Sequence, residues 1–292
     1  MAKFSVSFDD EGNLQSAFGR AWVDHQVPIN EGDDILHPCR LIAMGSIKFS
    51  KAFSEAVDAL IASDLYGGKN EGAFTSLLKA FEDLCYKATE MFDVFATMIP
   101  KAINFRPSSD FKKIAIDYAE TVKKRRDDWS FICNKIKHNN NVLFPIRQRC
   151  IQSGETVSGF ALYQPVPPSG MFRNKIFHKG ERSRPFDIAL RQLVHDIMRC
   201  DLAAAETLKK LPQTTSEKDQ VRIPTYQIRS KLQLLGKRRV LAGHHQKIMF
   251  DGFVMDNDGV HFVRSQAETL TGDIEIRLNF RGDGFTNQYE FA

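Results

Sequence analysis

The chain has 292 residues, 42% of them apolar and 26% charged, with a formal net charge of +4 at pH 7. That length suggests two domains, and the composition supports a full-sized core and excludes an intrinsically disordered chain. No apolar run approaches the roughly 18 residues of a membrane-spanning helix, and the first residues lack the apolar stretch of a secretory signal. We therefore expect a cytoplasmic protein with no membrane contact.

Residues 45–150 carry helical periodicity, after an N-terminal extension over residues 1–44. Apolar residues recur at helical spacing from Ile47 to Ile61, and a second stripe runs from an N-cap at Asn70 to Pro100. A third helix is expected to start near Ser109 and to end in the asparagine run that follows His138. Two long helices joined by about ten residues should pack as an antiparallel pair, so this region predicts a helical bundle.

Residues 151–292 are mixed in character and are expected to form a second domain. A long helix is predicted over 184–211, with Pro185 in its first turn, and a shorter helix stops at Gly236. Residues 239–280 alternate as β-strands, and "DNDG" at 256–259 is a strong hairpin signal. The expected fold class is therefore α+β, with an antiparallel helical bundle followed by a mixed α/β region ending in an antiparallel sheet.

The motifs of several large enzyme classes do not occur in the sequence. The absence of Walker, GxGxxG, GxSxG and HExxH patterns argues against nucleotide-driven motors, dinucleotide enzymes, serine hydrolases and zinc proteases. His244 and His245 are adjacent, so on a strand they point to opposite faces, and we expect neither a metal site nor a cofactor. The cysteines are widely spaced without a CxxC pair and are expected to be free thiols: Cys39, Cys85, Cys133, Cys150 and Cys200.

Positive charge is concentrated in residues 123–150, which contain eight Lys and Arg residues and two Asp residues, a net charge of +6. Such a block favours a polyanionic partner, RNA or another nucleic acid, although a solvated helix face would look the same. Arg125 lies on the apolar stripe, so it either extends past Trp129 to solvent or points into a site. The candidate nucleic-acid-binding residues are Lys123, Lys124, Arg125, Arg126, Lys137, Arg147 and Arg149, with a second cluster at Lys237, Arg238 and Arg239. A basic loop before the long helix is either a further anion site or a solvated loop, and it contains His178, Lys179, Arg182 and Arg184.

The stretch "WSFICNKIKHNNN" combines a helix end with groups suited to RNA cleavage. Asn134 and His138 form an i, i+4 pair on one helical face, with Lys135 beside them. Histidine exchanges protons near neutral pH, and cations stabilise a crowded phosphorus centre, so His138, Asn134 and Lys135 are the candidate catalytic residues. The structural alternative is an ordinary helix C-terminus, which favours Lys, His and an Asn cap.

With its helical hairpin and its terminal "NKIKHNN", the chain resembles the HEPN superfamily over about residues 45–150, a third of its length. Members of that family are mostly RNases of toxin–antitoxin, phage-defence and CRISPR systems that work as dimers, with a catalytic Arg four to six residues before a His. The matching positions here are Phe131, Ile132 and Cys133, so no Arg is present, and Asn134, Lys135 and Lys137 are the nearest polar substitutes.

The resemblance implies an RNA-directed protein and a metal-independent endoribonuclease in a toxin or anti-phage defence setting. It also implies a homodimer and an antitoxin or defence-system partner protein. The missing Arg keeps open a non-enzymatic adaptor that binds a protein partner or nucleic acid through the same bundle.

Overall fold

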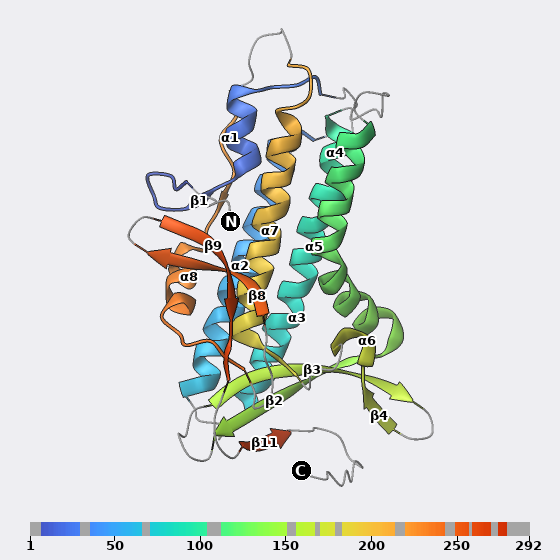
Figure 1. The fold of residues 1–292 in the computed structure, drawn as a ribbon, viewed down its shortest axis with the longest axis vertical. Helices are drawn as coiled ribbons and strands as arrows, with labels where there is room; N and C mark the ends of the chain where they lie inside the picture. The colour runs from blue at the N-terminus through green and yellow to red at the C-terminus, as the bar shows by residue number, and fades with distance from the viewer. Residues whose placement is uncertain are drawn as a thin grey trace.

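The protein is an α+β fold in which long helices stand on one end of an antiparallel sheet (Figure 1). The computed structural model describes residues 7–29, 36–65, 71–103, 112–150, 156–166, 170–178, 183–213, 220–242, 249–256, 259–269 and 274–278. The helices are α1 (Ala17–Asp24), α2 (Pro38–Leu65), α3 (Glu71–Asp93), the π-helix η1 (Val94–Met98), α4 (Ile99–Ala102), α5 (Lys112–Asn139), α6 (Lys175–His178), α7 (Phe186–Leu208) and α8 (Arg229–Gly236).

The principal sheet has the strand order β11–β2–β3–β4, all antiparallel, and β5 pairs with β3 beyond this path. Its strands are β2 (Val142–Cys150), β3 (Thr156–Val166), β4 (Gly170–Arg173), β5 (Arg184–Pro185) and β11 (Ile274–Leu278). Pro145 has no N–H to donate, and it lies just beyond Ile146, where the pairing of β11 with β2 ends. Gly159 is needed where β5 approaches, because a Cβ there would lie 2.8 Å from the carbonyl oxygen of Arg184.

Shorter strands hold the remaining segments against the helices. The expected hairpin is confirmed, since β8 and β9 pair in a register that places Asp256 opposite Gly259. It lies across α7, as Figure 1 shows. The other strands form two small pairs, β1 with β6 and β10 with β7, and their bounds are β1 (Leu14–Gln15), β6 (Thr225–Tyr226), β7 (Leu241–Ala242), β8 (Met249–Asp256), β9 (Gly259–Gln266) and β10 (Glu268–Thr269).

The expected antiparallel helical pair is present as α3 and α5, and the long helix expected at 184–211 is α7. Pro100 does not end the second helix, because the π turn of η1 precedes it and α4 continues to Ala102 with proline in its first turn. The boundary expected at residue 45 lies inside α2. Helix α1 packs against α7 and buries Phe18 and Trp22 in the same core.

One hydrophobic core joins the two halves of the sequence. Phe81 of α3, Phe160 of β3 and Phe186 of α7 meet with ring centroids 4.7 to 5.2 Å apart, and all three are fully buried. Aromatic contacts of this kind add to the area term of burial. Helix α7 therefore belongs to the bundle, although it follows the sheet strands β2 and β3 in the sequence.

Candidate nucleic-acid interface

The asparagine run after α5 is a helix cap. Asn140 has a φ of 50°, the left-handed conformation that asparagine tolerates better than most residues. The N–H of Asn141 turns back to donate to the carbonyl of Lys135 at 3.1 Å, and its side-chain amide donates to the carbonyl of Asn139 at 3.0 Å. The asparagines therefore form an ordinary helix C-terminus, the alternative that the sequence left open. The cap also fixes the last turn of α5, which carries His138.

His138 and Asn134 are both exposed on the last turns of α5. They continue a row of polar side chains at four-residue spacing, Arg126, Ser130, Asn134 and His138. At a rise of 1.5 Å per residue, this row extends over about 18 Å of the helix. Asn134 and His138 are about 40° apart around α5 and so share a face, whereas Arg126 is about 120° from His138 because the row winds around the helix.

An open hollow of about 690 Å³ lies beside this row, between α5 and the π turn η1. Ala96 of η1 and Ala119 of α5 are its smallest lining side chains. The other lining residues come from α5: Lys123, Arg126, Asp127, Ser130, Phe131 and Asn134. π-helical turns are frequent at functional sites, and here one contributes directly to the surface depression.

Arg126 is held in place at the edge of the hollow. Its guanidinium forms an ion pair of 3.2 Å with Asp93 at the end of α3, and its Nε donates to Ser130 Oγ at 3.1 Å. The Arg126 and Asp93 side chains remain 37% and 42% exposed, so the pair is accessible to a ligand. An exposed pair of this kind contributes little to stability, and its effect here is to orient the guanidinium.

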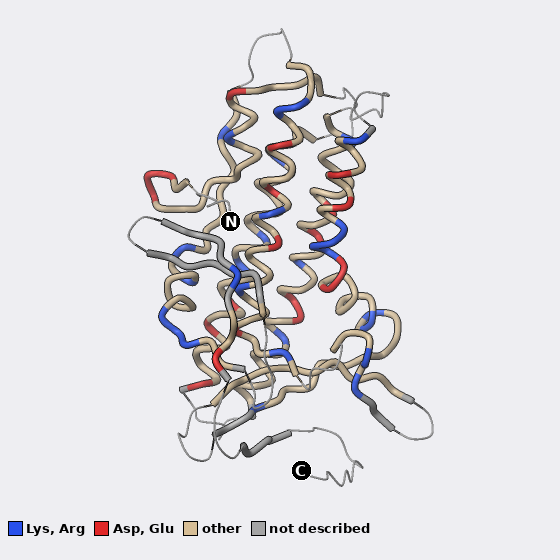
Figure 2. Tube along the Cα trace, in the orientation of Figure 1, with Lys and Arg blue, Asp and Glu red and all other residues tan. Residues whose placement is uncertain are grey.

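Two of the predicted lysines lie above aromatic rings. The Lys135 ammonium is 5.3 Å from the centroid of Phe131, and the Lys137 ammonium is 5.3 Å from the centroid of Tyr86 on α3. These cation–π contacts restrain the lysines near the end of α5. Lys123 and Lys124 are exposed, and Figure 2 shows the basic residues of α5 as bands interrupted by acidic ones.

Arg125 points inward to a core carboxylate. Its Nη1 lies 3.2 Å from Asp196 Oδ1 on α7, and the indole Nε1 of Trp129 donates to Asp196 Oδ2 at 3.0 Å. Asp196 is only 3% exposed, so Arg125 compensates a buried charge and joins α5 to α7. The sequence alternative in which Arg125 extends past Trp129 to solvent is wrong, and the contact is structural.

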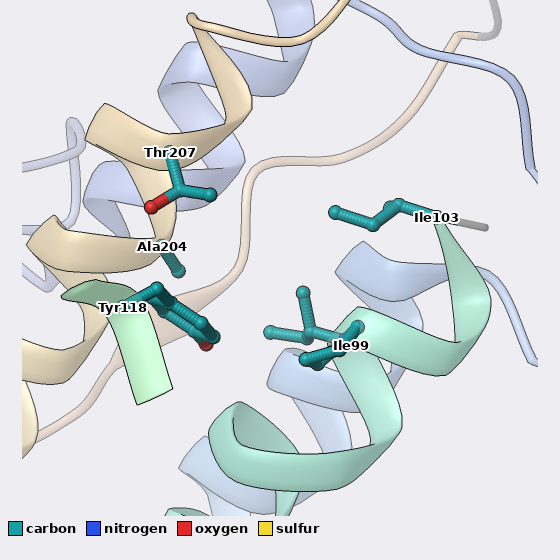
Figure 3. A pocket seen from close by; sticks show the side chains of 6 residues that line it. Ile99, Ile103, Tyr118, Ala204 and Thr207 are labelled. Carbon is teal, nitrogen blue, oxygen red and sulfur yellow. The ribbon is translucent and has the colours of Figure 1, made fainter. Parts of the chain in front are cut away.

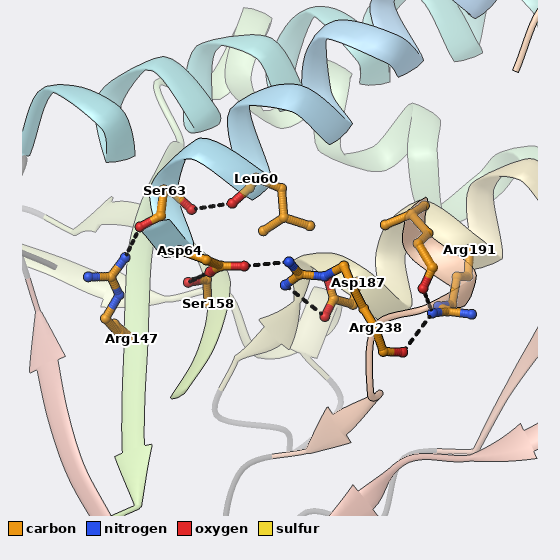
Figure 4. A network of polar contacts seen from close by, with 9 residues as sticks. Leu60, Ser63, Asp64, Arg147, Ser158, Asp187, Arg191 and Arg238 are labelled. Atoms are coloured by element: carbon orange, nitrogen blue, oxygen red, sulfur yellow. Dashed lines mark hydrogen bonds and ion pairs between the residues drawn. The ribbon is translucent and has the colours of Figure 1, made fainter. Parts of the chain in front are cut away.

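The second basic cluster is largely paired within the protein. Arg238 lies 2.5 Å from Asp64 and 3.1 Å from Asp187, as Figure 4 shows. These two ion pairs join the end of α2 to the start of α7. Arg239 pairs with Glu268, and Lys237 is exposed at the end of α8.

Arg147 belongs to the same polar network as Arg238. It donates to the carbonyl of Ser63 at 2.9 Å (Figure 4). Its guanidinium also lies 4.7 Å from the ring centroid of Phe74. Arg149 is in β2, where its backbone pairs with Thr156, and its side chain lies outside the described part of the structure. Arg147 therefore joins strand β2 of the sheet to the end of α2, whereas Arg238 joins two helices of the bundle.

The basic loop expected at 178–184 does not form an open anion site around His178. His178 is 1% exposed, and its Nε2 accepts the N–H of Leu162 at 2.9 Å. Burial, together with Arg173 and Arg184, lowers its pKa to about 3, so the ring is neutral. Lys179 and Arg182 lie outside the described residues.

The sequence reasoning missed Arg173 and Lys175, which the fold brings near the end of α5. They flank Asn174, whose side-chain amide donates to Asn141 Oδ1 at 3.2 Å. Phe177 of α6 stacks on Phe131 of α5 with centroids 6.2 Å apart. No local pattern could reveal this neighbour, because it depends on how β4 and α6 return to α5.

A second cavity lies where α4, α5 and α7 meet, and it is much smaller (Figure 3). Its volume is about 10 Å³, and its lining is almost entirely apolar, with Ile99, Ile103 and Tyr118 prominent. It is no larger than the space of one water molecule, and it is a packing gap rather than a ligand site.

Within the described ranges, no group of three or more His, Cys, Asp or Glu side chains converges to hold a metal ion. His244 and His245 are outside those ranges. The described cysteines Cys39, Cys85, Cys133 and Cys200 are free and buried, and burial raises their thiol pKa values. A buried thiol with a raised pKa is a poor nucleophile. None of the described helices meets the length and hydropathy that a membrane crossing requires.

No protein-family model, curated protein or solved structure matches this chain. The resemblance to HEPN proteins therefore stays a prediction drawn from the motif.

Proposed function

We propose that this protein binds RNA along the exposed face of α5 and cleaves it without a metal ion. The observation that carries the proposal is the row from Arg126 to His138, which ends in an exposed histidine and borders an open hollow. Lys123, Lys135 and Lys137 add positive charge along the same helix. Cations along a helix attract phosphates without regard to the base sequence of the RNA.

In this proposal His138 removes the proton of a ribose 2′-hydroxyl, and the freed oxygen attacks the adjacent phosphorus. The bond from phosphorus to the 5′-oxygen breaks, which leaves a 2′,3′-cyclic phosphate, and the departing oxygen takes a proton from water. Lys135 and Lys137 stabilise the negative charge that grows on the phosphate oxygens. Asn134, one turn before His138, donates a hydrogen bond to one of those oxygens.

The family resemblance extends the proposal to a homodimer that joins two such motifs, to a cytoplasmic location, and to an antitoxin or defence-system partner. A second candidate is a non-enzymatic adaptor that binds nucleic acid or a protein. The capped end of α5 favours it, because the asparagines have a structural role and no arginine lies within a turn of His138.

The test incubates purified protein with total RNA in EDTA and compares the wild type with His138→Ala. Asn139→Ala is the matched control, since Asn139 is exposed in the same turn and its side chain plays no part in the proposal. We expect cyclic-phosphate products from the wild type and the control, and none from His138→Ala at an unchanged melting temperature. RNA binding without cleavage by all three proteins would favour the adaptor.

Salt dependence tests the binding step by itself. If Lys123, Arg126, Lys135 and Lys137 each neutralise one phosphate, the logarithm of the binding constant should fall with a slope of about −3 against the logarithm of salt concentration. Lys123→Ala should reduce that slope by about 0.7. A slope near zero would contradict electrostatic binding of RNA to this face.

A further inference from the structure

The surface around the capped end of α5 is built from elements that carry cations and no carboxylate. Within the described parts of residues 134–178, which include the end of α5, β2, β3, β4 and α6, there is no Asp or Glu. Figure 2 shows basic residues without acidic ones on β4 and α6. In the part of the chain that the structure describes, no ion pair engages the exposed or half-exposed cations of these elements, Lys135, Lys137, Arg173 and Lys175.

The middle of α5, by comparison, is partly neutralised by its own neighbours. Arg126 pairs with Asp93 at 3.2 Å, and the next two residues of the helix are Asp127 and Asp128. Arg184 pairs with Asp128 at 3.6 Å. Because paired cations attract a polyanion less strongly than unpaired ones, the attraction for phosphate is stronger at the capped end of α5 than in its middle.

The corner between β4 and α6, residues 173–175, is fixed to this end of α5. Its central residue, Asn174, is 1% exposed, and the side-chain amide donates to Asn141 Oδ1 in the cap at 3.2 Å. The backbone N–H of Asn174 donates to the carbonyl of Leu162 at 2.7 Å, and its Oδ1 accepts the N–H of Phe177 at 3.1 Å. A buried polar group with several partners holds one geometry, so this β4–α6 corner keeps its two cations beside the cap.

Around α5, His138 lies between two neighbouring parts of the fold. At about 100° per residue, Arg126 is about 120° from His138 in one direction, where it pairs with Asp93 at the end of α3. Phe131 is about 20° from His138 in the other direction, where it stacks on Phe177 of α6. The polar row and α3 therefore lie on one side of His138, and α6 with the β4–α6 corner lies on the other.

We propose that an RNA strand bound along α5 continues past His138 onto the β4–α6 corner, where Arg173 and Lys175 bind its next phosphates. This inference rests on the proposed RNA binding and cleavage, and it adds a second binding segment to them. The cleaved bond then lies inside the bound stretch, with phosphates held on both sides. The substrate is an internal bond of a single strand, and cleavage needs no free end.

The two cations of the corner bind phosphate in different ways. The guanidinium of Arg173 can donate two parallel hydrogen bonds to one phosphate, whereas the ammonium of Lys175 acts as a point charge. Positively charged tracks follow the backbone of a single strand without regard to its bases. A strand held on both sides of His138 has its 2′-hydroxyl and phosphorus restrained beside the imidazole, which is the positioning part of catalysis.

The binding test measures the salt dependence of RNA binding by fluorescence anisotropy, in EDTA and with His138→Ala protein to prevent cleavage. Two further phosphate contacts should change the slope from about −3 to about −4. The double variant Arg173→Ala with Lys175→Ala should return the slope to about −3, and Lys175→Ala alone, at an exposed position, should reduce its size by about 0.7. Lys51→Ala, at an exposed position of α2, is the matched control and should leave the slope unchanged.

The cleavage test uses DNA oligonucleotides that contain one ribonucleotide, because only that position has a 2′-hydroxyl to attack. The wild type should cleave fastest with the ribonucleotide at the centre, and about tenfold more slowly when it is moved to the end that leaves the corner without a strand. The double variant should cleave the central substrate as slowly as that end-placed one. Lys51→Ala should behave as the wild type does.

The outcomes separate the corner from the proposed function. A slope near −3 that the double variant leaves unchanged would overturn the corner and leave RNA binding to α5 in place. An equal change of slope in Lys51→Ala would also overturn it, because the effect would then be one of general charge. A slope near zero would overturn both proposals. Wild-type cleavage that is independent of the position of the ribonucleotide would overturn the placement of His138 inside the bound stretch.

Discussion

The contact of Arg125 with Asp196 gives the sharpest test of how α5 is held in the bundle. In Asp196→Ala, the buried indole N–H of Trp129 loses its acceptor, at a cost of about 1 to 3 kcal/mol. Arg125 loses this buried carboxylate as a partner at the same time. Its side chain is 21% exposed, so we reduce the usual cost of breaking a buried ion pair to about 2 kcal/mol. The expected total is about 4 kcal/mol.

For a chain of this size, each kcal/mol lowers the melting temperature by about 2 °C, so Asp196→Ala should melt about 8 °C below the wild type. Arg125→Met keeps an unbranched side chain against Trp129 and removes the charge. Combining it with Asp196→Ala should recover about 2 kcal/mol relative to the sum of the single changes, because the double variant has neither member of the Arg125–Asp196 pair. Thermal and urea unfolding of the four proteins give this coupling energy.

The same variants test the assignment of Arg125 to the scaffold instead of the RNA-binding face. Arg125→Met should leave the salt slope of RNA binding unchanged, whereas Lys123→Ala should reduce it. Additive stability effects, with a coupling below about 0.5 kcal/mol, would refute the structural contact. A reduced salt slope in Arg125→Met would show that the guanidinium reaches the ligand after all.

Three further predictions concern single groups. Asp201 accepts hydrogen bonds at the start of α1, yet burial raises its pKa to about 6, above the unfolded value near 3.8. The protonated form therefore stabilises the folded protein. This contribution is fully present below about pH 4 and is lost as the pH rises through about 6. Asp201→Asn should therefore flatten the change in unfolding free energy between pH 4 and 7, and an unchanged pH profile would contradict this. Asn140→Ala should lower the unfolding free energy by about 1 kcal/mol because alanine is strained at the positive φ of this position, whereas Asn140→Gly should leave it unchanged. Equal losses in the two variants, measured by thermal unfolding, would exclude a backbone cause. Arg238→Met should remove one of the two cations that lower the pKa of Asp187, the other being Arg191, and so raise the pKa of that carboxyl further. The unfolding free energy should fall by about 2 kcal/mol at pH 7 and by less at pH 5, and equal losses at both pH values would contradict this.

Features that depend on neighbours in the sequence could be predicted well. The apolar stripes of α3 and α5, the antiparallel pairing of these helices, helix α7 and the β8–β9 hairpin follow from periodicity and turn chemistry. The asparagine cap after α5 is also a local property, since it needs one residue that tolerates positive φ. The π turn of η1 could not be foreseen, because the stripe of apolar residues runs through it without a break.

The candidate site was predictable in part for the same reason. Asn134 and His138 share a face because helical geometry alone relates residues four apart. Arg126 belongs to that row too, but its orientation depends on Asp93, which lies 33 residues earlier and meets α5 only in the folded protein. The hollow likewise needs η1 and α5 side by side, so no stretch of sequence contains it.

The sequence by itself determined where charge and helix ends lie along the chain, because those properties depend on composition and on a few neighbouring residues. Only the tertiary structure decided what each cation does. Arg125 and Arg238 meet buried or partly buried carboxylates on distant elements, whereas Lys123 and Lys124 remain exposed. The physical reason is that an unpaired charge is costly only where the fold removes it from water, and burial is a property of the packed chain.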